Sequence, residues 1–183
     1  MGHVRRLLLA MSLADLALLP VAVQAGSLTE YVTGLEYAVG TCLGGQTGSF
    51  AGYGSGSIGG QSNAFLSTTI CHTSLANTAG ATATISPGGT FTLYMRSITL
   101  VGQYTSGTVG PGIVSPLYSG STSFCKEVYP VAAGLGPAAN VPVGATSISG
   151  GTASGTLTHL GLFTAGGGCS AFAAMIAGVA TLN

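Results

Sequence analysis

Residues able to carry acid–base chemistry are scarce in this chain of 183 residues. It contains three histidines and four acidic residues, and Asp15 is the only aspartate. No serine lies in the G-x-S-x-G pattern of a nucleophile elbow. Glu127 stands beside Lys126, which predicts a solvated charge pair. We therefore predict no catalytic residue. A hydrolase with an unrecognised site is an alternative, and it would be favoured if Glu127 lay close to His72 or His159 in a cleft.

The two histidines outside the N-terminal segment lie among apolar residues of predicted strands. His72 shares a face with Ile70, and His159 shares one with Leu157. Such histidines are expected to be hydrogen-bonded core residues. Zinc bound with the help of cysteines is the alternative, but the chain has no C-x-x-C or H-x-x-x-H spacing. We predict no metal-binding residue.

One glycine-rich segment matches a nucleotide-binding pattern. Residues 54–59 spell G-x-G-x-x-G, which in a dinucleotide site follows a strand, opens a helix and precedes an acidic residue by about 20 positions. No acidic residue occurs between Glu36 and Glu127. The pattern therefore predicts a glycine-rich strand and turn, and no cofactor or cofactor-binding residue is expected.

The four cysteines are expected to form two disulfides, because an even number in an exported chain is typical of a disulfide framework. Three pairings are possible. We favour Cys42–Cys71 with Cys125–Cys169, because each pair then flanks its own block of strands.

The N-terminus has the three parts of a secretory signal peptide. Arg5 and Arg6 precede an apolar run, which ends at Val23-Gln24-Ala25 with small residues where signal peptidase reads the chain. We predict cleavage between Ala25 and Gly26 and a secreted, extracellular protein that could stay associated with the cell surface. A membrane anchor is the alternative, although the run is shorter than the roughly 20 residues of a stable span; the paired arginines also leave twin-arginine export open.

The predicted mature chain, residues 26–183, is nearly free of charge. Charged residues make up 4% of the whole sequence, against about a quarter in ordinary domains. Nucleic-acid binding is excluded, because phosphate contacts need clustered Lys and Arg. Stability is expected to change little between about pH 3 and pH 8. Little electrostatic repulsion is left between molecules, so we expect association with the cell envelope or an extracellular surface, and self-association.

Short β-rich runs between glycines predict an all-β fold. Pro87-Gly88-Gly89 is predicted to join 81–85 to 90–101 in a hairpin, with a bulge near Ser97. On the exposed face of its second strand, Tyr94 and Arg96 are weak candidates for ligand binding. The other expected strands are 35–43, 48–58, 64–73, 121–129, 145–149 and 155–163.

Two segments depart from the pattern of short strands. Ser170–Leu182 fits either a helix or a closing strand, and the all-β context favours the strand. Residues 130–143 contain two glycines and three prolines, which predicts a long irregular loop. Together the elements predict one antiparallel domain with Gly-rich turns, either a β-sandwich or a barrel. Its runs are shorter than the roughly ten-residue strands of an outer-membrane barrel, so no integral membrane protein is expected.

These features favour a non-enzymatic extracellular or envelope protein with a structural, adhesive or interaction role. An extracellular binding module for a glycan or an apolar small molecule is the first alternative. The hydrolase is the second.

Overall fold

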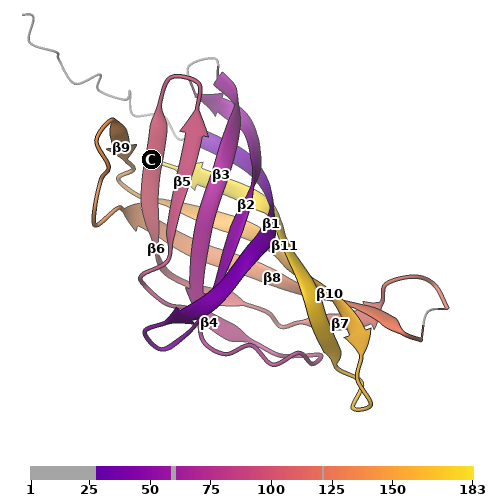
Figure 1. The fold of residues 1–183 in the computed structure, drawn as a ribbon. Coiled ribbons are helices and arrows are strands. Elements are labelled where there is room, and N and C mark those ends of the chain that lie inside the picture. The colour runs from indigo at the N-terminus through magenta and orange to yellow at the C-terminus, as the bar shows by residue number, and fades with distance from the viewer. Residues whose placement is uncertain (1–27, 59–60, 121) are drawn as a thin grey trace, which may run out of the picture.

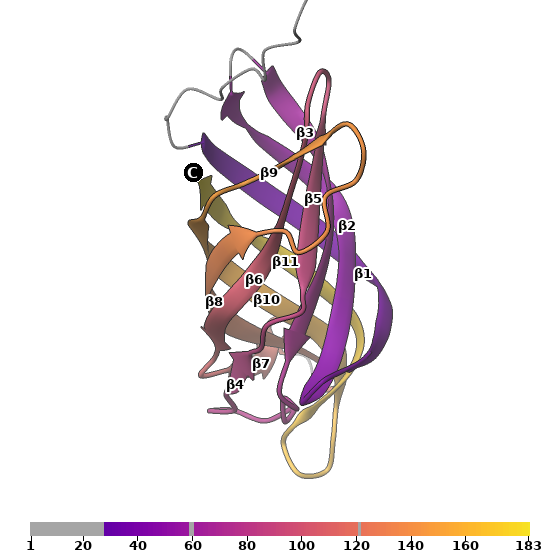
Figure 2. The same cartoon turned by 90° about the vertical axis from the view of Figure 1, so that its left-hand side faces the viewer.

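Eight antiparallel strands close into a barrel (Figure 1). The computed structural model describes residues 28–58, 61–120 and 122–183, so the predicted signal peptide and its cleavage between Ala25 and Gly26 lie outside the described residues. β8 pairs with β6 and closes the wall (Figure 2). In order around the wall the strands are β6 (Thr99–Val109), β5 (Thr90–Met95), β3 (Gln61–His72), β2 (Gly45–Ile58), β1 (Leu28–Cys42), β11 (Cys169–Leu182), β10 (Gly151–Phe163) and β8 (Phe124–Pro137).

Three short strands complete the wall and its ends. β4 (Ala83–Ile85) pairs with β6 and with the end of β3, so it occupies the gap left below the short β5. β9 (Ala145–Ser147) runs parallel to β6 where β8 has ended. β7 (Ile113–Pro116) pairs only with β8 and extends the sheet beside the barrel.

The barrel interior is an apolar core. Side chains alternate along each strand, and one set points inward. Buried residues from all the wall strands meet there, among them Phe50, Leu66, Leu93, Tyr104 and Leu157. Of the two predicted architectures, the barrel is therefore the correct one, and the all-β prediction is confirmed. No helix long and apolar enough to cross a membrane occurs in the described part of the chain.

The predicted hairpin joined the wrong strands. β4 does not pair with β5; each of them pairs with β3 and β6. The chain reverses directly after β5, where the backbone N–H of Met95 donates to the carbonyl of Ile98 at 2.9 Å. The break in alternation at Ser97 is therefore a turn rather than a bulge, and Arg96 lies exposed in that turn.

The predicted loop at residues 130–143 is also wrong over its first half, because β8 continues to Pro137. Pro130 is tolerated because it lies where β8 changes partner, after β7 at Val128 and before β6 at Val131. A missing backbone N–H costs least at such an interruption of the ladder.

The strand predicted for Ser170–Leu182 is confirmed as β11. Six strands are 12 to 15 residues long, which is longer than the runs predicted from sequence.

Both predicted disulfides are present. Cys42–Cys71 joins β1 to β3 across β2, with 6.1 Å between the Cα atoms. Cys125–Cys169 joins β8 to β11 across β10, with a Cα separation of 5.9 Å. Each bond therefore ties together three adjacent strands near the same end of the barrel.

Candidate functional site

A cleft of about 500 Å³ opens at the disulfide-bearing end of the barrel, the lower end in Figure 1. One wall comes from β1 and β2, including Val39 and Thr47, and another from residues 171–174 of β11. Three titratable side chains, those of Glu36, His72 and His159, line this cleft and also a smaller void inside the barrel. These three side chains therefore form the floor that separates the cleft from the core.

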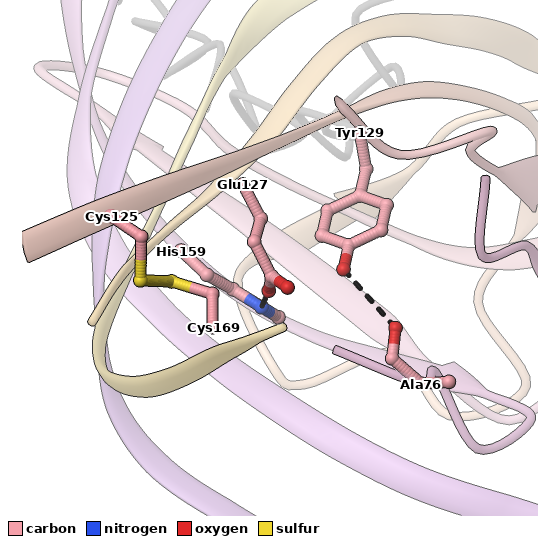
Figure 3. Close-up of polar contacts among 6 residues, drawn as sticks. All are labelled: Ala76, Cys125, Glu127, Tyr129, His159 and Cys169. Carbon is pink, nitrogen blue, oxygen red and sulfur yellow. Dashed lines mark hydrogen bonds and ion pairs between the residues drawn. A yellow bond between two sulfur atoms is a disulfide. The ribbon is translucent and has the colours of Figure 1, made fainter. Parts of the chain in front are cut away.

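Behind this floor lies a buried carboxylate. Glu127 Oε2 is 3.2 Å from Nδ1 of His159, and the Glu127 side chain is fully buried (Figure 3). The two residues are cross-strand partners on β8 and β10. Their side chains point inward because both positions follow the apolar alternation of their strands, two residues after Cys125 and Leu157 respectively.

Tyr129 packs against this pair from the other side. Its ring packs against the His159 ring at 5.4 Å between centroids, and its hydroxyl donates to the carbonyl of Ala76 at 3.2 Å (Figure 3). Burial, and next the negative charge of Glu127, raise the pKa of the Tyr129 hydroxyl. Tyr129 therefore stays protonated and acts as a hydrogen-bond donor.

The hydrogen bonds determine which ring nitrogen of each histidine carries the proton. Nδ1 of His72 lies 2.7 Å from the carbonyl oxygen of Thr73, which only accepts, so this nitrogen donates. Nδ1 of His159 faces the Glu127 carboxylate and donates in the same way. In the neutral rings, Nε2 of both histidines is therefore an unprotonated acceptor.

Burial also favours the neutral form of His159. Desolvation lowers the pKa of His159, and the charge of His72 lowers it further, whereas the hydrogen bond to Glu127 opposes this change. Burial likewise raises the pKa of Glu36, the floor residue that β1 contributes. The carboxyl group of Glu36 fits there because Gly48 leaves space; a Cβ at Gly48 would lie 2.7 Å from Glu36 Oε1.

This arrangement can accept protons and hydrogen bonds from a molecule in the cleft. A neutral imidazole held at Nδ1 by a carboxylate is the arrangement of a general base. Among the residues that line the cleft, the only hydroxyl groups are those of Thr41 and Thr47, and neither is hydrogen-bonded to His159. Within residues 28–58, 61–120 and 122–183, no three His, Cys, Asp or Glu side chains are placed to hold one metal ion.

The predicted charge pair of Glu127 with Lys126 is wrong. Neighbouring residues of a strand point to opposite faces, so Glu127 enters the core and Lys126 lies on the outer side. Both histidines are hydrogen-bonded at the edge of the core, as predicted. The cleft that they share with Glu36 was not foreseen.

The weak binding candidates Tyr94 and Arg96 lie away from the cleft. Tyr94 is half-exposed on the outer face of β5, and its ring centroid is 6.1 Å from that of Phe65. Phe65 in turn lies 6.0 Å from Tyr53. These three rings form an outer aromatic row across β2, β3 and β5, and Arg96 lies beyond its edge in the turn after β5.

Comparison with known proteins gives no relative. No protein-family model, no curated protein and no solved structure matches the chain. The protein is thus defined by its own architecture: a closed eight-stranded antiparallel barrel with an apolar interior, two disulfides and a histidine–glutamate floor beneath an open cleft.

Proposed function

We propose that the protein is an exported barrel that binds a small, partly apolar organic molecule in its cleft. The observation that carries this proposal is the buried Glu127–His159 hydrogen bond in the floor of the cleft. Burying a carboxylate is costly unless it is paired, and this chain has very few charged groups. Two disulfides, typical of oxidising compartments, and the signal-like N-terminus support export.

The lining of the cleft supports a ligand with both apolar and polar parts. Val39, Leu75 and Phe172 provide apolar contact area, while the two histidines and Glu36 provide polar groups at the floor. Ligand sites are typically concave and mostly apolar, with a few polar groups that orient the ligand. A volume of about 500 Å³ lies within the range of such sites.

Two other functions have less support from the structure. The outer aromatic row favours contact through the surface, as expected from the composition, because exposed apolar patches mark interaction sites. The Glu127–His159 pair supports a hydrolase, but within the described residues no nucleophile is hydrogen-bonded to His159. The cleft explains more of the unusual features of the molecule than either alternative.

Binding of the uncharged fluorophore N-phenyl-1-naphthylamine to the oxidised protein tests the proposal. Its fluorescence should rise on addition of protein, because it would leave water for an apolar wall. Ala171→Trp, which fills the cleft, should weaken binding at least fivefold. Ala177→Trp is the matched control, because Ala177 is exposed on the same strand but does not line the cleft.

A third variant separates the cleft from the outer surface. Tyr53→Ser breaks the outer aromatic row and should leave fluorophore binding unchanged. Equal binding by the wild type and Ala171→Trp would refute the proposal. Loss of fluorophore binding in Tyr53→Ser alone would indicate that the ligand binds on the outer face, which would favour the surface role.

A further inference from the structure

The charged groups of the barrel are sorted by sign. The three described carboxylates all lie inward: Glu30 and Glu127 are buried, and Glu36 lines the cleft. Both described cationic side chains lie outside, Arg96 in the exposed turn after β5 and Lys126 on the outer side of β8. The cleft therefore has one acidic side chain in its lining, Glu36, and no Lys or Arg.

The polar groups of the cleft floor are acceptors. Nδ1 of His72 and Nδ1 of His159 donate to Thr73 O and Glu127 Oε2, so in the neutral form of each ring Nε2 has a free lone pair. Glu36 forms no hydrogen bond or ion pair with any other described residue. A ligand that satisfies this floor must bring donors.

We propose that the ligand is an organic ammonium ion with an apolar body, its N–H groups directed at Glu36 and at Nε2 of His159. This inference rests on the proposed function, because it assigns the ligand class of the same cleft. An ammonium ion supplies three donors and a positive charge. Its apolar body would lie against Val39, Leu75 and Phe172.

Electrostatics favours this class over its competitors. A half-buried carboxylate without a cation nearby is poorly solvated, and a bound ammonium ion would compensate for that loss. A carboxylate ligand would meet Glu36 and Glu127 with like charge. A bare metal ion needs several ligands at short range, and the part of the chain that the structure describes has no such set of three.

Competition among three ligands with the same hexyl chain tests the inference. Hexylammonium, hexanol and hexanoate would each displace N-phenyl-1-naphthylamine at neutral pH. We expect hexylammonium to compete at a concentration at least tenfold below that of hexanol, and hexanoate to compete least. Failure of the fluorophore to bind would contradict the proposed function. Fluorophore binding without a preference for hexylammonium would contradict only the assignment of the ligand class.

Glu36→Gln assigns the preference to one side chain. The amide keeps the shape of the carboxyl group and removes its charge, so hexylammonium should lose its advantage over hexanol while the fluorophore still binds. Glu30→Gln is the matched control, because Glu30 is an inward carboxylate that does not line the cleft. An ammonium preference that survives Glu36→Gln would contradict the assignment.

Discussion

Glu30 shows how glycine positions make room for a buried charge. Its side chain is 1% exposed, and its Oε2 atom has no hydrogen-bond partner. Gly54 and Gly56, which face it from β2, belong to the segment that resembled a nucleotide motif; a Cβ at Gly54 would lie 3.0 Å from Glu30 Oε2. In the described residues these glycines therefore serve close packing in a strand, as predicted.

The pKa of Glu30 is raised by burial from the ordinary value of 4.5, and this determines a pH dependence of stability. The folded state holds the proton more tightly than the unfolded state. The contribution of Glu30 to stability is therefore complete below about pH 4.5 and is lost as pH rises through the folded pKa. His159 acts in the opposite direction, because its lowered pKa makes protonation favour the unfolded state as pH falls below 6.5. The expectation of stability nearly independent of pH is thus revised.

Glu30→Gln is predicted to stabilise the protein at pH 7. The variant removes a buried carboxylate whose Oε2 atom has no hydrogen-bond partner, and the gain should be about 1 kcal/mol, or a rise in Tm of about 2–4 °C for a chain of this size. Thermal unfolding followed by circular dichroism at pH 7 and pH 4 measures it. At pH 4 the gain should shrink, because the wild-type carboxyl is then protonated. A variant no more stable than the wild type at pH 7 would show that Glu30 carries no such cost.

At the scale of elements, strands were predictable but their partners were not. Local alternation identified most strands, since a half-buried strand repeats every two residues. Pairing is decided by residues far apart in sequence, such as Thr69 with Thr90 and Val109 with Val131. For the same reason the site could not be predicted from sequence. The pair Glu127 and His159 comes together only when β8 and β10 adopt their register, and the one available signal was a titratable residue on the apolar face of each strand.

The β5–β6 turn predicts the order of proteolysis. Arg96 is exposed in this turn, whereas Lys126 lies within β8, so trypsin should cut the oxidised protein at Arg96 before Lys126. Neither disulfide crosses residue 96, so the two fragments should separate on a non-reducing denaturing gel. Mass spectrometry of the bands identifies the cut. First cleavage at Lys126, or an Arg96→Gln variant cut at the same rate, would contradict the turn.

At the scale of the whole molecule, closure of the barrel determines where the site lies. Both disulfides tie strand triplets at the end that bears the cleft, which holds the four strands carrying Glu36, His72, Glu127 and His159 in place. The disulfide pairing followed from sequence, because each pair of cysteines brackets a local block of strands. The sorting of carboxylates inward and cations outward could not be predicted, because it depends on which face of each strand closes over the core.

Nitrogen-15 NMR of histidine-labelled, oxidised protein near neutral pH tests the central claim most directly. It reports which nitrogen of each ring carries the proton. His159 is predicted to be neutral with the proton on Nδ1, and Nδ1 of His72 is predicted to be protonated as well. The His159 Nε2 resonance is predicted to shift when hexylammonium is added. A His159 ring protonated on Nε2, or one that does not respond to hexylammonium, would contradict the account.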